Sequence, residues 1–152
     1  MMKRYVKVAM GVCVAVLATA LAAYVGLPRG ATYTMHGMGI MTTTASGEQL
    51  GTLLTQTAWA LGDVNDLGDG RRQFPSFHQG GQSWNDGAGK SLGFRGVTEF
   101  DDKNGNHYTI ERVSIPGTPE ILLLKANDSK TTMALANEVM RQFQLLHVRH
   151  KE

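Results

Sequence analysis

The sequence predicts an α+β protein: an N-terminal apolar helix, followed by a small antiparallel sheet with two helices packed on one of its faces. Three observations lead to this prediction. An uncharged segment occupies residues 8–27, two amphipathic stripes with helical spacing lie near residues 47–61 and 129–148, and three strand-like runs follow one another within residues 91–126. The expected order of elements is β-α-long loop-β-β-β-α, and helices on one face of an antiparallel sheet define the α+β class.

Residues 1–27 have the pattern of an export signal or a membrane anchor. Lys3, Arg4 and Lys7 precede a stretch of 20 residues without a charge. Positive charges beside an apolar segment stay on the cytoplasmic side of the membrane. We therefore expect residues 28–152 to be periplasmic, or anchored in the inner membrane with the C-terminal domain outside the cytoplasm.

Two fates of this segment remain open. A cleaved signal peptide has an apolar core of about 7–15 residues followed by small residues at the cut, and Ala20-Leu21-Ala22 fits such a site. A transmembrane helix needs about 20 apolar residues, and residues 8–27 provide that length. If the segment is not cleaved, residues 8–27 attach the protein to the membrane.

The charge and the cysteine content of the chain also depend on this segment. Residues 1–22 contain three of the 15 Lys and Arg residues and none of the 13 Asp and Glu residues. The remainder has a formal net charge of −1, which gives no support for nucleic-acid binding. Cys13, the only cysteine, lies in the same segment. The exported domain therefore has no disulfide and must be stabilised by its core.

The first strand and the first helix of the domain follow from side-chain type and spacing. Residues 32–44 are rich in β-branched and bulky side chains and predict one strand, loosened by two glycines. Ser46 is followed three residues later by Gln49, which is a capping-box pattern at a helix start. A helix is therefore predicted over residues 47–61.

Three further strands and a last helix are predicted in the second half of the chain. The strands at residues 91–100, 108–115 and 120–126 are separated by turns containing Gly or Pro and should form an antiparallel meander. The last helix is expected over residues 129–148, with Asp128 or Ser129 as its cap. No internal repeat or second domain is visible, so residues 28–152 are expected to form a single exported α+β domain.

Residues 63–90 are predicted to form a long Gly-rich loop, far above the usual loop length of about 4–6 residues. Its Arg, His and large aromatic side chains are Arg71, Arg72, Phe74, Phe77, His78 and Trp84. Aromatic and Arg side chains are the anchors that protein interfaces use, so these six residues are predicted to contact a partner or a ligand. In the alternative interpretation, the aromatic side chains fold back and cover the sheet.

The sequence favours a non-enzymatic protein. Its five His residues are scattered and no Ser is marked by a nucleophile motif, so neither a catalytic residue nor a cofactor is assigned. Met35, His36 and Met38 offer the soft ligands that suit Cu(I). A strand turns Met35 and Met38 to opposite faces, however, so ordinary packing is the simpler interpretation and no metal site is assigned.

These observations predict an exported envelope protein that serves as an accessory or adaptor subunit of a membrane-associated assembly, with a protein partner in the envelope. The alternative is a periplasmic ligand-binding or hydrolytic protein whose site lies at residues 63–90. Copper handling is a weaker alternative.

Overall fold

The computed structural model describes residues 30–151, of which 41% lie in strands and 26% in helices. The predicted N-terminal apolar helix, with the signal or anchor assigned to residues 1–27, lies outside the described residues.

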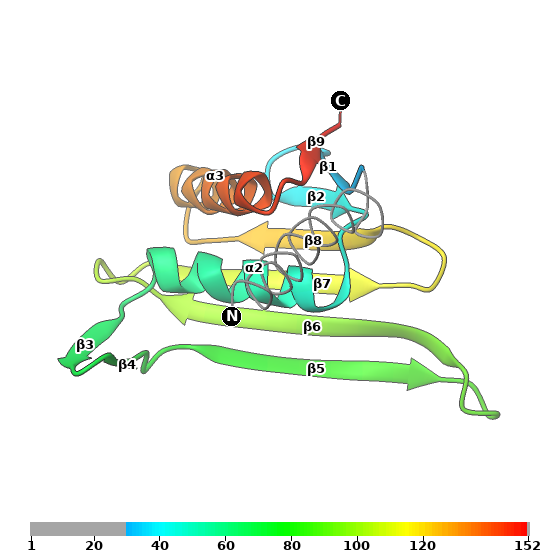
Figure 1. Cartoon of the computed structure of the whole chain (residues 1–152), viewed down its shortest axis with the longest axis horizontal. Helices are drawn as coiled ribbons and strands as arrows, with labels where there is room; N and C mark the ends of the chain where they lie inside the picture. The colour runs from blue at the N-terminus through cyan, green and yellow to red at the C-terminus, as the bar shows by residue number, and fades with distance from the viewer. Residues whose placement is uncertain (1–29, 152) are drawn as a thin grey trace, which may run out of the picture. The chain divides into compact units, whose positions relative to one another are not determined.

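Seven strands form one sheet in the order β5-β6-β7-β8-β2-β1-β9 (Figure 1). In chain order they are β1 (Thr32–Met35), β2 (Ile40–Thr43), β5 (His78–Asn85), β6 (Ser91–Asp101), β7 (His107–Ser114), β8 (Glu120–Lys125) and β9 (Arg149–His150). The pairs from β5 through β6, β7, β8 and β2 to β1 are all antiparallel. A separate two-stranded sheet joins β3 (Asn65–Gly68) to β4 (Arg71–Gln73).

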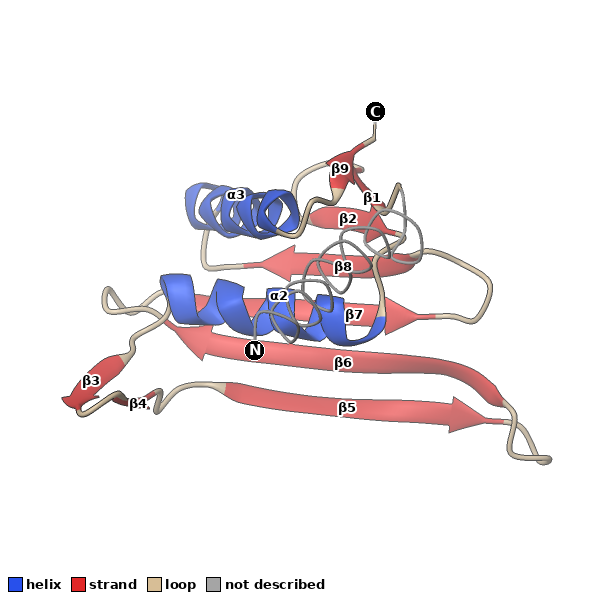
Figure 2. Cartoon of the chain, viewed as in Figure 1, coloured by secondary structure: helices blue, strands red, loops and turns tan. Residues whose placement is uncertain are grey.

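Two helices, α2 (Gly47–Leu61) and α3 (Ser129–Leu145), cover one face of the large sheet (Figure 2). They contact each other, and α3 also contacts β8. The start of α3 is capped by Asp128, whose side chain accepts a hydrogen bond from the Thr131 N–H at 2.7 Å. Each helix buries one apolar stripe, which in α2 includes Leu50, Leu53 and Leu54.

The core lies between the helices and the alternate sheet residues that face them. Phe100, Ile110 and Leu122 come from β6, β7 and β8, and all three are completely buried. The rings of Phe100 and Tyr108 stack with their centroids 4.8 Å apart. Side chains of the opposite parity point to the other face of the sheet, which no described helix covers.

The structure contradicts the predicted fold class in the size and the order of the sheet. A seven-stranded sheet replaces the small one that we expected. Residues 32–44, predicted as one strand, form the β1–β2 hairpin, because Gly37 and Gly39 adopt φ values of 123° and 85° at its turn. Strand-like side chains lie on both sides of this turn, so composition alone does not reveal it.

The predicted loop at residues 63–90 is also wrong, because this segment contains β3, β4 and β5. Strand β5 pairs along its length with β6, from His78 opposite Glu99 to Asn85 opposite Ser91. All eight of its residues are exposed, so they show no alternation of apolar and polar side chains. The pairing comes from backbone hydrogen bonds, which leave no period in the sequence.

The remaining elements match their predicted positions closely. The helix predicted over residues 47–61 is confirmed, and the three later strands begin and end within one residue of the predicted bounds. The last helix ends at Leu145, three residues early. His147 then adopts a left-handed φ of 59°, and the chain turns to place β9 beside β1.

Candidate functional site

Strand β5 forms one edge of the seven-stranded sheet (Figure 1). It pairs with β6 on one side, and within residues 30–151 no strand lies on its other side. All eight residues of β5 are exposed. An edge strand of this kind presents backbone N–H and C=O groups to which another strand can pair.

The sequence of β5 lacks the charged residues and prolines that usually protect a sheet edge. Native edges are blunted by Lys, Pro, bulges or short length. Residues 78–85 read His-Gln-Gly-Gly-Gln-Ser-Trp-Asn and contain no Lys, Arg, Asp, Glu or Pro. The register with β6 shifts at the far end, between Trp84 and Asn85. From His78 to Trp84 the edge is therefore regular, and it carries no Lys, Arg, Asp or Glu side chain.

The opposite edge of the sheet differs. There the two-residue strand β9 lies beside β1, and the Lys151 N–H donates a hydrogen bond to the Tyr33 carbonyl at 2.8 Å. The buried Tyr33 ring stacks on Phe143 with a centroid separation of 4.7 Å. The C-terminal segment thus covers this edge, whereas β5 is left open along eight residues.

A groove separates α2 from β5 on the helix face of the sheet. It consists of two adjoining hollows of about 540 and 460 Å³, which share Gly51 and Gln79. The larger hollow is lined by Gly51 and Leu54 from α2, Gln79 and Gly81 from β5, and Phe94 and Gly96 from β6. The groove therefore lies directly beside the open edge, and we define it as the α2–β5 groove.

Phe94 forms the floor of this groove because its neighbours are glycines. A Cβ atom at Gly81 would lie 2.7 Å from the Phe94 ring, and one at Gly96 would lie 2.9 Å from it. Both distances are shorter than a van der Waals contact, so the half-buried ring occupies the space that two side chains would otherwise fill. The guanidinium carbon of Arg112 lies 5.9 Å from the ring centroid.

Gly51 forms part of the helical wall of the groove. It lies inside α2, where glycine is about 1 kcal/mol less favourable than alanine. Apart from its chain neighbours and the nearby backbone of its own helix, no described atom lies within 4 Å of the position that its Cβ would take. Packing within the described domain therefore does not require a glycine here, and the missing side chain keeps the groove open.

Three of the predicted contact residues, Arg72, Phe74 and Phe77, lie together in the structure. They pack on the domain itself and do not form an open contact surface. Phe74 packs against Trp59, Phe77 and Phe100, with centroid separations of 5.4, 5.3 and 6.0 Å. Phe74 and Phe77 are half-buried, and the guanidinium carbon of Arg72 lies 5.9 Å from the Trp59 ring centroid. Phe74 and Phe77 therefore agree with the alternative interpretation, in which aromatic side chains of this segment fold back onto the domain.

The other predicted contact residues lie apart from this cluster. Arg71 is exposed in β4, opposite Gly68. His78 and Trp84 occupy the two ends of β5, about 20 Å apart for six residues of a strand. Trp84 is 42% exposed and pairs with Gly93. The six residues therefore do not converge on one site.

The groove residues from α2 and β6 were missed by sequence reasoning. Among them, Gly51 could have been noticed in the sequence, because a glycine inside a strongly predicted helix indicates a packing or functional role at that position. Phe94 and Gly96 lie in a predicted strand, and the sequence does not reveal that α2 leaves this part of the strand open to the groove.

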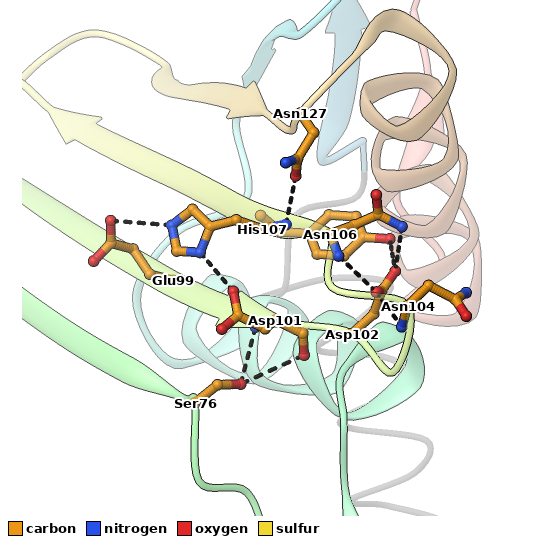
Figure 3. A network of polar contacts seen from close by, with 9 residues as sticks. Ser76, Glu99, Asp101, Asp102, Asn104, Asn106, His107 and Asn127 are labelled. Carbon is orange, nitrogen blue, oxygen red and sulfur yellow. Dashed lines mark hydrogen bonds and ion pairs between the residues drawn. The ribbon is translucent and has the colours of Figure 1, made fainter.

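A polar cluster surrounds the turn between β6 and β7 (Figure 3). The Asp102 carboxylate accepts hydrogen bonds from the backbone N–H groups of Asn104 and Asn106, from the Asn106 side chain and from the Tyr108 hydroxyl, at 2.8–2.9 Å. Burial raises the pKa of Asp102, but these hydrogen bonds outweigh it and hold the pKa below its usual value. The cluster stabilises the turn.

His107 in the same cluster lies between two carboxylates. Its Nδ1 atom is 2.7 Å from Asp101 Oδ1, and its Nε2 atom is 3.6 Å from Glu99 Oε1. The hydrogen bond to Asp101 raises the pKa of His107 against the opposing effect of burial. The nearby Ser76 hydroxyl bonds to the backbone of Asp101. In a Ser-His-Asp triad the imidazole accepts the Ser proton, and this Ser is instead engaged by backbone, so the cluster does not have that arrangement.

The methionines considered for copper do not converge. Met35 and Met41 face each other across the β1–β2 hairpin, and Met41 is completely buried. Met38 lies in the turn and is 54% exposed. No group of three or more His, Cys, Asp and Glu residues within the described part of the chain could hold a metal ion.

In the described range, neither helix combines the length and the apolar character that crossing a membrane requires. Comparisons of the chain with protein-family models, with curated proteins and with solved structures gave no significant match. The functional interpretation therefore depends on the β5 edge and the α2–β5 groove.

Proposed function

We propose that the protein is a non-enzymatic exported adaptor, an accessory subunit of a membrane-associated envelope assembly, which binds its protein partner by strand addition to β5. The observation that carries this proposal is the open edge: eight exposed residues in a regular strand at the end of a seven-stranded sheet. An extended segment of another protein can pair with such an edge. Backbone hydrogen bonds then provide affinity, and alternate side chains provide specificity.

The energetics of such pairing are favourable for β5. In an antiparallel sheet every second residue directs its N–H and C=O groups away from the existing neighbour, so an added strand satisfies the outer groups. Each hydrogen bond contributes about 0.5–1.5 kcal/mol net of the lost water contacts. The absence of Lys, Arg, Asp and Glu in residues 78–85 means that no fixed charge opposes an incoming strand.

The proposed location follows from the N-terminal segment. Residues 8–27 attach the adaptor to the membrane if they are retained, and cleavage after Ala22 releases it into the periplasm. The net charge of −1 for residues 23–152 supports a protein partner rather than nucleic acid.

The polar cluster around His107 has a structural role beside the proposed binding edge. His107 is bound by carboxylates on both sides, and the Ser76 hydroxyl is held by the Asp101 backbone. These contacts connect β6 to β7 and to the segment that leads into β5, which makes the cluster a support for the edge.

Photo-crosslinking in cells that produce the full chain tests the proposal. A photo-reactive amino acid at Gln82 in β5 is compared with one at Gln144, an exposed residue of α3. We expect a specific crosslinked product with an envelope protein from position 82 and not from position 144. Adding Gly80→Lys should strongly reduce this product, because a Lys side chain in an edge strand opposes pairing with another strand, whereas Gly80→Ala should preserve it.

Gly80 is suited to these substitutions, because no described atom lies within 4 Å of the position that a Cβ would take there and its backbone is not strained. A product that forms equally from both crosslinker positions, or that persists at the same level in Gly80→Lys, would contradict binding at β5.

A further inference from the structure

We infer that the partner segment carries one large, uncharged apolar side chain, which passes over Gly81 and packs on Phe94 in the α2–β5 groove. This inference rests on the proposed function, because it takes the partner to be an extended strand paired with β5. It goes further by naming the side chain that the site selects and the position where that side chain binds.

The position follows from the alternation of side chains along β5. Gln79, Gly81 and Ser83 belong to the face that carries the helices, because they pair with Thr98, Gly96 and Phe94 of β6. On an added strand, the residue opposite each of them would have its Cβ about 4.5–5.5 Å away. Opposite Gln79 or Ser83, a polar side chain stands between the partner and the groove.

Opposite Gly81, no side chain intervenes. The Phe94 ring extends over this glycine, close enough that an added Cβ would lie 2.7 Å from two ring atoms. A partner side chain at this position therefore faces the ring directly across the edge of the sheet. Aromatic–aromatic and aromatic–β-branched pairs are among the cross-strand contacts that stabilise a sheet.

The groove has room for such a side chain. The hollow over Phe94 measures about 540 Å³ and continues along α2 past Gly51. Nothing that packs near Gly51 within the described domain requires a glycine at this position, and a glycine lowers the stability of a helix. A groove that must admit an incoming side chain explains why a bulkier residue is absent there.

The charges around the groove favour an uncharged side chain. Arg112 lies beside Phe94, and its guanidinium is bound to Glu120 at 3.2 Å. Glu48 lines the second hollow. A buried charge needs a partner. The charge of Arg112 is already paired with Glu120 through one terminal nitrogen, and its buried Nε atom has no hydrogen-bond partner among the described residues. An uncharged Phe, Trp, Leu or Ile side chain therefore fits best.

A phage library of random nine-residue peptides, selected on the purified full chain in detergent micelles, tests this inference. We expect the selected peptides to share Phe, Trp, Leu or Ile at one fixed position, with few prolines around it. Gly51→Phe, which fills the groove, should weaken the selected peptides at least 10-fold, whereas Gln144→Phe, at an exposed position of α3 that does not line the groove, should change their affinity less than 2-fold. Gly80→Lys should remove binding of all selected peptides.

The outcomes separate the two proposals. If peptides bind and lose affinity in Gly80→Lys but share no large apolar position, or bind Gly51→Phe as well as the wild type, the inference is wrong while strand addition stands. If no peptide binds, or Gly80→Lys has no effect, strand addition itself is wrong. Should Gly51→Phe fail to fold, Phe94→Ala replaces it, and unchanged affinity in that variant contradicts the inference.

Discussion

The Phe94 ring lies over the backbone of Gly81, so that a Cβ atom at residue 81 would come within 2.7 Å of the ring atoms Cε2 and Cζ. The glycine belongs to the open edge strand and the ring belongs to the strand beside it. This relationship places an aromatic side chain at the boundary between a sheet edge and a groove. It connects the two features on which the proposed function depends.

The pair of adjacent glycines in β5 gives a direct stability test of this relationship. Gly81→Ala should destabilise the domain by about 1 kcal/mol, because the Phe94 ring must leave its position. Gly80→Ala meets no described atom and should be neutral or stabilising by about 0.4–1 kcal/mol. Urea unfolding of both variants measures the difference, and equal free energies of unfolding would contradict the packing of Phe94 on Gly81.

Gly51→Ala should stabilise the domain by about 0.5–1 kcal/mol, because alanine favours the helix and its methyl group enters open space. Gly62→Ala is the matched opposite case at the end of the same helix. There a Cβ would lie 2.0 Å from the Phe74 ring and 2.7 Å from the Ala58 carbonyl oxygen, so a clear loss of stability is expected. Thermal unfolding compares the two, and a destabilising Gly51→Ala would mean that this glycine has a packing role in the domain.

Phe74 and Trp84, two of the predicted contact residues, should respond differently to truncation. Phe74→Ala removes a half-buried ring that touches three other aromatic residues, and should lower the free energy of unfolding by about 2 kcal/mol. Trp84→Ala removes a side chain that is 42% exposed at the end of β5 and should have a much smaller effect. Denaturant unfolding checks both, and a larger loss in Trp84→Ala would reverse their assigned roles.

His107 should make the stability of the domain depend on pH. The hydrogen bond to Asp101 raises the pKa of His107 above its ordinary value of 6.5. The protonated form is therefore favoured in the folded state, and its stabilising contribution is complete below pH 6.5 and is lost as the pH rises through the folded-state pKa. The gap in free energy of unfolding between the wild type and His107→Gln should shrink with rising pH.

Urea unfolding of both proteins from about pH 5.5 to pH 8.5 covers the range around the unfolded-state pKa of 6.5 and above it. A gap that stays constant, or that widens with rising pH, would contradict the carboxylate pairing of His107.

Elements with a buried face were predictable from the sequence, and β5 was not. The helix at residues 47–61 shows its apolar stripe because Leu50, Leu53 and Leu54 are buried together. Strand β5 buries none of its eight residues, so no alternation marks it. Its conformation is set by backbone pairing to β6, a contact between distant parts of the chain that local patterns do not encode.

The candidate site was predictable only in its general region. The aromatic residues at positions 63–90 suggested a contact surface, but Phe74 packs on Trp59 and Phe77 packs on Phe74, because their rings gain more by packing than by exposure to water. The groove residues come from three separate elements. These residues meet because β5 is the edge strand and because α2 leaves the part of the sheet beside β5 uncovered. The sequence alone shows neither of these two features.

Amide hydrogen exchange by NMR tests strand addition to β5 most directly. The full chain is measured alone and with a saturating amount of a peptide selected on it. If β5 is an open edge that accepts a strand, alternate amides from His78 to Trp84 exchange rapidly in the free protein and become strongly protected in the complex. Protection of those amides already in the free protein, or peptide binding that leaves their exchange unchanged, would contradict it.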